Sequence, residues 1–166
     1  MEPLWAKEGY DSHSRAVNDL VSRYADMLFR IASLRLSSRA DAEDAVQTVF
    51  LTYLTKRKLF ASDEHCKAWL IRVVINLCHN INKRNSARRT ESLEVLSGET
   101  PAEETSTVLR EIMALSPHYR DVIYLHYYEG YKLREIARLL RKNESTVGTW
   151  LVRAREQLKL QLTGDE

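Results

Sequence analysis

Five polar side chains between Arg72 and Lys83 have the types and the spacing that nucleic-acid binding requires. Successive members lie three or four residues apart, except for the adjacent His79 and Asn80, so all five share one side of the helix predicted over residues 64–84. We call this set the polar stripe: Arg72, Asn76, His79, Asn80 and Lys83. Amide and guanidinium groups can hydrogen-bond base edges, whereas a cation holds a phosphate whatever the sequence. A solvated helix face is the simpler interpretation of the same pattern.

Three aromatic residues, Tyr53, Phe60 and Trp69, bracket a polar connector over residues 56–64, just before the polar stripe. Unpaired bases stack on aromatic rings, so rings beside cations suit a single-stranded nucleic acid. Large aromatic side chains are more often mostly buried, and for Tyr53 and Trp69 a place in the core is the favoured interpretation.

The stretch from Glu129 to Leu160 is typical of a helix-turn-helix with a basic second helix. Its first helix is predicted over residues 132–140, with Ile136, Ala137 and Leu140 facing inward, and Asn143 is a good N-cap for the second. The second helix has a predicted buried stripe of Val147, Leu151, Ala154 and Leu158. Its exposed faces offer Ser145, Thr149, Arg153, Arg155 and Lys159. An ordinary amphipathic hairpin has the same periodicity.

The helix predicted over residues 39–55 begins with three acids, Asp41, Glu43 and Asp44. Acids near a helix N-terminus interact favourably with its dipole. Alternatively, Asp44 and Gln47, with Leu51 exposed beside them, dock against a basic partner. Sequence physics leaves both interpretations open.

Other kinds of chemistry have little support in the sequence. The pairs His65-Cys66 and Cys78-His79 would lie about 18 Å apart on one helix, too far for a single ion, so we expect no metal site. No catalytic or phosphate-cradling constellation indicates an enzyme, and we expect no cofactor and no small-molecule substrate. Without a signal peptide or a membrane-spanning apolar run, a cytoplasmic protein is expected.

Helices must position all of these residues. Predicted helices over 14–36, 39–55 and 64–84 can bury one common core. The segment from Asn85 to Thr107 changes character: Arg88 and Arg89 close the basic lobe, and residues 90–106 are interpreted as an extended linker. A short helix then precedes Ser116-Pro117, a helix start, and the next helix ends at Gly130, a plausible left-handed cap.

The predicted fold class is therefore all-α: two small helical domains joined by a flexible acidic linker, the C-terminal one a helix-turn-helix. The charge follows this division, since residues 1–90 carry a net +5, residues 91–107 carry −5 and residues 108–166 carry +2. Two basic lobes around an acidic segment suit a nucleic-acid partner. The domain boundaries are placed at 1–89, 90–106 and 107–166.

Four motifs, taken in order, resemble the extracytoplasmic-function (ECF) group of bacterial RNA polymerase sigma factors. They are DAEDAVQTVFLTYL (41–54), KAWLIRVVINLCHNINKR (67–84), LSPHYRDVIYLHYYEGYKLREIARLL (115–140) and STVGTWLVRAR (145–155). The resemblance covers about residues 14–160. It implies a sigma factor that binds core RNA polymerase and directs promoter-specific transcription initiation.

The resemblance also implies roles for particular residues. Those that would bind −10 DNA are Arg72, Asn76, His79, Asn80, Lys83 and Arg84. Those that would read the −35 element are Ser145, Thr146, Thr149, Trp150, Arg153 and Arg155. Those that would bind the polymerase β′ clamp are Asp41, Asp44, Gln47, Phe50 and Leu51. The 56–66 loop would capture a flipped base of the −10 element, the linker would thread the polymerase cleft, and helices over 107–130 would meet the β flap. The family commonly has an anti-sigma factor as a further partner.

The C-terminal motif departs from the family pattern at three positions. Gly148 stands where the family usually has Arg or Lys, so the −35 preference is expected to differ. Arg141 replaces a common turn glycine, and Lys132 replaces the usual Ser or Thr cap. Two alternatives remain at this stage: a free-standing helix-turn-helix regulator of duplex operator DNA, and a pure interaction protein such as an anti-sigma factor or adaptor.

Overall fold

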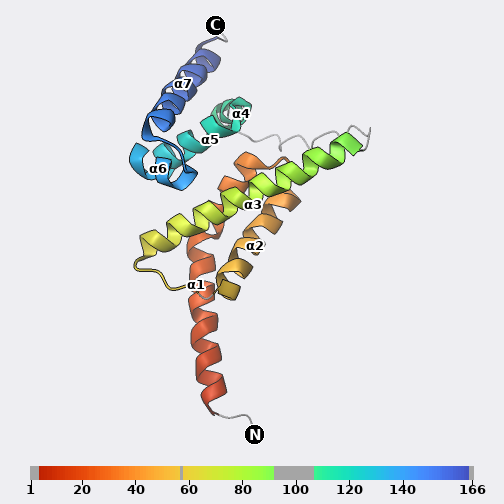
Figure 1. The fold of residues 1–166 in the computed structure, drawn as a ribbon, viewed down its shortest axis with the longest axis vertical. Helices are drawn as coiled ribbons and strands as arrows, with labels where there is room; N and C mark the ends of the chain where they lie inside the picture. Colours follow the sequence, from red (N-terminus) through yellow and green to blue (C-terminus); the bar gives the residue numbers. More distant parts are fainter. Residues whose placement is uncertain (1–3, 57, 92–106, 165–166) are drawn as a thin grey trace.

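A computed structural model of the chain describes residues 4–56, 58–91 and 107–164. Within these ranges every regular element is a helix and no strand occurs, as predicted (Figure 1). Three helices form an N-terminal lobe: α1 (Leu4–Arg35), α2 (Arg39–Lys56) and α3 (Asp63–Glu91). The C-terminal lobe comprises α4 (Thr107–Ala114), α5 (Pro117–Ile123), a π-helix η1 (Tyr124–Tyr128), α6 (Leu133–Leu140) and α7 (Glu144–Thr163).

The N-terminal lobe is a three-helix bundle in which each helix packs against the other two. Its core contains the predicted inward faces, including Leu28 and Ile31 of α1, Val49 of α2, and Leu70 and Val74 of α3. The helix expected from Ser14 begins earlier, at Leu4, and its N-terminal part projects beyond α2 and α3 (Figure 1).

The third helix is longer than predicted. The predicted helix ended near Arg84, whereas α3 continues to Glu91, so residues 85–91 are helical and the predicted start of the linker at residue 90 lies within the helix. Asn85 is tied to the bundle, because its side-chain amide donates to Asp41 Oδ2 at 3.1 Å. Asn82, one turn earlier, donates to the backbone carbonyl of Arg35 at 2.9 Å. The expected flexible linker beyond this helix, residues 92–106, lies outside the described residues.

The C-terminal lobe begins much as the sequence indicates. Ser116 is the N-cap residue of α5 with Pro117 directly after it, and Gly130 has a φ of +75°, the left-handed conformation expected of it. Between them the helix does not stay α-helical. Residues 124–128 form a π-helix, a local widening that periodicity does not reveal.

The helix-turn-helix is present as predicted. Val147, Leu151 and Ala154 of α7 are buried, as are Ile136 and Ala137 of α6, whereas Leu158, the fourth residue of the predicted stripe, is only half-buried. Leu139 is buried as well, whereas Leu140, the predicted inward residue, is only partly buried. Arg141 adopts a left-handed φ of 54° in the turn, which costs a non-glycine residue about 1 kcal/mol.

The caps of these two helices also depart from the usual pattern. Asn143 occupies the N-cap position of α7, but its side chain makes no capping hydrogen bond. At α6, the Lys132 backbone N–H is instead satisfied by Glu135, whose Oε2 accepts it at 2.8 Å.

The two lobes pack against each other, with α1 contacting α5 and α3 contacting α6. Among the side chains that the structure describes, Asp121 of α5 is the only buried charged one, and it pairs with Arg35 at the end of α1. None of the described helices is long and apolar enough to cross a membrane.

Candidate nucleic-acid and polymerase interface

The polar stripe lies on the exposed side of α3. All five of its side chains are exposed, as is Arg84, which follows them. The other side of the helix is fixed in the bundle by Leu70, Val74 and Cys78, which are fully buried. The stripe is therefore a continuous polar surface held on a rigid helix.

The connector before α3 ends in an aromatic cluster. Tyr53 and Phe60 are stacked with 6.2 Å between ring centroids, and Trp69 lies 5.6 Å from Phe60. All three rings are partly buried and pack against the core, so the favoured core interpretation of Tyr53 and Trp69 is confirmed. Lys58 Nζ lies within 6 Å of the Phe60 and Trp69 centroids, and Leu59 between Lys58 and Phe60 is 95% exposed.

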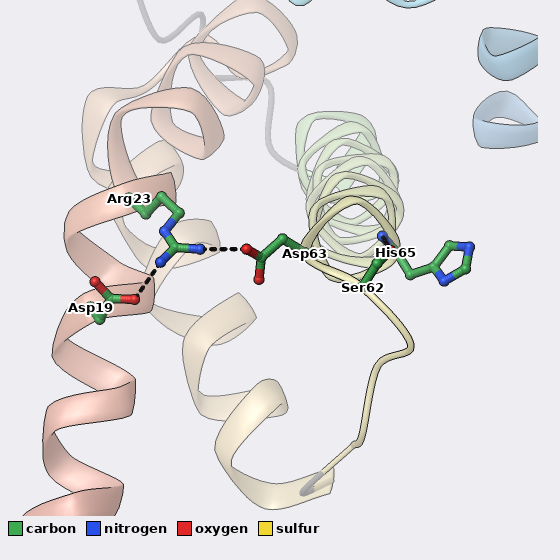
Figure 2. Close-up of polar contacts among 5 residues, drawn as sticks. All are labelled: Asp19, Arg23, Ser62, Asp63 and His65. Atoms are coloured by element: carbon green, nitrogen blue, oxygen red, sulfur yellow. Dashed lines mark hydrogen bonds and ion pairs between the residues drawn. The ribbon is translucent and has the colours of Figure 1, made fainter.

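Ionic and capping contacts anchor the end of this loop. Figure 2 shows Arg23 of α1 between two carboxylates, Asp19 at 2.6 Å and Asp63 at 3.1 Å. Ser62 caps α3, because its hydroxyl accepts the backbone N–H of His65 at 3.2 Å. The His65 ring points away from the Arg23 cluster. The loop therefore has a fixed base on α1 and an exposed apolar tip at Leu59.

The recognition helix α7 presents most of its predicted DNA-binding residues to solvent. Ser145, Thr149, Arg153 and Arg155 are exposed, and Thr146 is half-buried. The Thr149 hydroxyl donates to the Ser145 carbonyl at 2.9 Å, which leaves its lone pairs able to accept.

Trp150 differs from these residues, because its ring is half-buried and stacks on His118 with centroids 4.6 Å apart. The stacking ties α7 to α5.

The predicted polymerase-binding residues of α2 divide into two groups. Asp44, Gln47 and Leu51 are exposed, and Leu51 has an exposed fraction of 61%. Asp41 and Phe50 are half-buried: Asp41 accepts the amide of Asn85, and Phe50 packs against the core. The exposed three form the accessible part of this face.

Family models match both lobes of the chain. Residues 20–89 match the model of Sigma-70 region 2, and residues 106–158 match that of Sigma-70, region 4. The ECF RNA polymerase sigma factor SigM of Mycobacterium tuberculosis is 31% identical over 147 residues, covering 86% of this chain and 75% of the relative. The chain belongs to the ECF group of RNA polymerase sigma factors. A second relative, the RNA polymerase sigma factor SigV of Bacillus subtilis, is 28% identical over 142 residues, which are 83% of this chain and 86% of that one.

Solved structures share the fold of this sigma factor. The sigma factor RpoE of Bartonella quintana, determined in complex with the anti-sigma factor NepR, has a TM-score of 0.75 at 22% identity and covers 90% of this chain and 98% of its own. CnrH, determined with the cytosolic domain of CnrY, has a TM-score of 0.67 at 25% identity, covering 92% and 91%.

Membership of this family settles the function among the alternatives that the sequence left open. The protein is a sigma factor that directs promoter-specific transcription initiation, and the free-standing regulator interpretation is wrong. Lys58 and Leu59 were not predicted as single residues of the loop, although their position between two aromatic residues, Tyr53 and Phe60, could have indicated them. Asn82 and Asn85 were not predicted either, because their contacts lie more than 40 residues away in the sequence.

Proposed function

We propose that the two lobes of this sigma factor divide the promoter between them. Residues 1–89 bind the −10 element and the β′ clamp, residues 107–166 read the −35 element, and residues 90–106 connect them. The observation that carries the proposal is the pair of exposed reading helices, α3 with its polar stripe and α7 with Ser145, Thr149 and Arg153. The protein has no catalytic role of its own in this proposal.

Within the stripe, we assign two kinds of contact. Asn76 and Asn80 contribute to base choice, because an amide offers a donor and an acceptor side by side. Arg72, Lys83 and Arg84 mainly hold phosphates, whatever the sequence. His79 lies on the same exposed face and completes the −10 surface.

The Lys58–Phe60 loop takes the unpaired base of the −10 element. Phe60 is anchored by stacking on Tyr53 and by a tilted ring contact with Trp69, so it holds the loop in place more than it binds a base. Leu59 and Lys58 at the tip are accessible, one apolar and one cationic. This combination suits a stacked base with a phosphate beside it.

In the C-terminal lobe, the N-terminal half of α7 enters the major groove at the −35 element. Ser145, Thr146 and Thr149 face base edges, while Arg153 and Arg155 hold the flanking phosphates. Trp150 positions the helix through its ring contact with His118 rather than by touching DNA.

Core RNA polymerase is the first protein partner. The β′ clamp binds a mixed acidic and apolar patch on α2 that is formed by the exposed side chains of Asp44, Gln47 and Leu51. The half-buried Asp41 and Phe50 belong to the same surface. Helices α4 and α5 meet the β flap. An anti-sigma factor is the second partner, in line with RpoE and CnrH, whose structures were determined with NepR and CnrY. Because the protein acts with bacterial RNA polymerase, we expect it in the cytoplasm.

Alanine variants of the polar stripe test the −10 assignment. Arg72→Ala, Asn76→Ala, Asn80→Ala and Lys83→Ala are assayed with core polymerase on a panel of −10 variants at two salt concentrations. Lys83→Ala should weaken all promoters about equally and flatten the salt dependence. Asn80→Ala should change the ranking among promoters.

A matched control is Asn82→Ala on the same helix. Its amide donates to the Arg35 carbonyl, so its loss should change stability and leave the promoter ranking intact. If all four stripe variants stay folded and keep both activity and ranking, the polar stripe is not a DNA surface.

A further inference from the structure

The N-terminal half of the recognition helix α7 carries no cation. Residues 144–152 contain no lysine or arginine, and the first cation of the helix is Arg153, in its third turn. Glu144 at the start of the helix adds a negative charge, which suits the helix dipole but repels phosphates. Binding to DNA depends strongly on the neutralisation of phosphates. At this end of α7 the attraction to the duplex must therefore come from residues outside the helix.

A cluster of four cations lies on α6 and in the turn that leads to α7. We call it the cationic turn: Arg134, Arg138, Arg141 and Lys142. All four side chains are exposed, and within the part of the chain that the structure describes none of them forms an ion pair. Glu135, the nearest acid on α6, accepts the backbone N–H of Lys132 instead. The charge of the cationic turn is therefore available to a partner.

Within the cationic turn, Arg141 has a strained backbone. Its φ of 54° and ψ of 48° are left-handed, a conformation that glycine adopts without a steric penalty. The conformation closes α6, because the Lys142 N–H donates to the Ala137 carbonyl at 2.9 Å. Glycine would satisfy the same turn, so the backbone does not require the arginine. Strain that the fold does not need is a reason to look for a function of the side chain.

The position of Arg141 relative to α7 indicates that function. A helix about 10–12 Å across fills a major groove that is about 12 Å wide, so residues just before its first turn meet the phosphates at the groove edge. Two peptide units separate Arg141 from Asn143, the N-cap of α7, which keeps their Cα atoms within about 8 Å. Helix α6 packs beside α7 (Figure 1), and the first helix of such a motif crosses the DNA backbone.

We propose that Arg141 binds a phosphate at the edge of the −35 element, and that the cationic turn supplies the positive charge that the N-terminal half of α7 lacks. A guanidinium group can donate two parallel hydrogen bonds to one phosphate, which suits an arginine at this place better than a lysine. The inference rests on the proposed function of α7 at the −35 element.

Fluorescence anisotropy of a labelled promoter duplex tests this role. The duplex is one from which the wild-type holoenzyme transcribes, and it is titrated with holoenzyme of each full-length variant at several NaCl concentrations. Arg141→Gly should weaken binding about fivefold and reduce the slope of log affinity against log salt by about 0.9, the value for one lost phosphate contact. The same substitution relieves the left-handed strain and should raise the melting temperature by up to about 4 °C. An arginine with a merely structural role would not give weaker binding together with higher stability.

Two further variants are the matched controls. Arg141→Lys keeps both the charge and the strained backbone, so its salt slope should equal that of the wild type. Arg39→Gln removes an exposed cation of the N-terminal lobe that already pairs with Glu43 at 2.8 Å, and it should leave affinity and slope unchanged.

Wild-type affinity and slope in Arg141→Gly would overturn the proposal, and so would an Arg141→Lys variant that binds as weakly and with as flat a slope as Arg141→Gly. Weaker binding with an unchanged slope would also overturn it, because the arginine would then act on protein rather than on phosphate. A lower melting temperature of Arg141→Gly would overturn the claim that the contact is held in a strained turn. Arg153→Ala distinguishes the two levels of the account: if it weakens binding and Arg141→Gly does not, only this inference fails, whereas if neither weakens binding, the −35 role of α7 fails as well.

Discussion

Gly148 of the recognition helix stands at a position where the fold does not require glycine. A Cβ there would meet only a Leu133 side-chain carbon at 3.8 Å, an ordinary van der Waals contact. Alanine favours a helix interior over glycine by about 1 kcal/mol. Gly148→Ala should therefore raise the melting temperature by about 2–4 °C, measured by circular dichroism. A lowered melting temperature would show that the surroundings of Gly148 are tighter than the structure has them.

The two cysteines should be chemically inert in the native protein. Both thiols are buried, and desolvation raises the pKa of Cys78 to about 11 and also raises that of Cys66. Because the thiolate is the reactive form, only about one Cys78 in a thousand is reactive at pH 8. Thiol labelling with and without denaturant checks this expectation. Two thiols per chain should react in the unfolded protein, and rapid labelling of Cys78 in the native protein would contradict the packing of α3.

At the scale of elements, one face of the recognition helix α7 is exposed for DNA binding and the opposite face packs in the core. Arg153→Ala and Thr149→Ala lie on the exposed face of α7 and should weaken −35 recognition without lowering the melting temperature. Val147→Ala and Leu151→Ala remove buried groups and should lower the free energy of unfolding by about 1–4 kcal/mol. Thermal melts and −35 promoter assays on all four variants distinguish the classes. If Arg153→Ala loses promoter activity only to the extent that its melting temperature falls, Arg153 has no role in binding DNA.

The sequence predicted those elements that carry an apolar stripe. Leu28, Leu70 and Leu151 belong to faces of helical period, and each is buried as expected. The last two turns of α3 carry almost no apolar side chains, so their helix could not be detected by periodicity. Its stability there comes from polar contacts such as the one between Asn85 and Asp41, which join distant parts of the sequence.

The candidate site was predictable where it depends on helical spacing. The polar stripe is exposed as a unit because spacings of three and four residues place side chains on one face. Phe50 and Asp41 were harder to interpret. An aromatic ring or an acid at a helix surface can serve the core or a partner, and only the tertiary contacts of α2 show that both are partly enclosed.

At the scale of the whole molecule, the sequence predicted two lobes but not their docking. The Arg35–Asp121 pair joins residues 86 positions apart, and nothing local to either residue indicates the other. The π-helix that precedes Glu129 likewise has no periodic signal. The arrangement of the lobes is therefore a property of the tertiary structure alone.

The most direct test of the central claim is in-vitro transcription with and without core RNA polymerase. Each lobe carries only a modest positive charge, too little for tight duplex binding at physiological salt by itself. The purified protein should therefore direct initiation from promoters with matching −10 and −35 elements only when core polymerase is present, and it should bind isolated duplex promoter DNA weakly. Tight, sequence-specific binding of the duplex by the protein alone, with no promoter-specific transcript in the presence of core polymerase, would contradict the account.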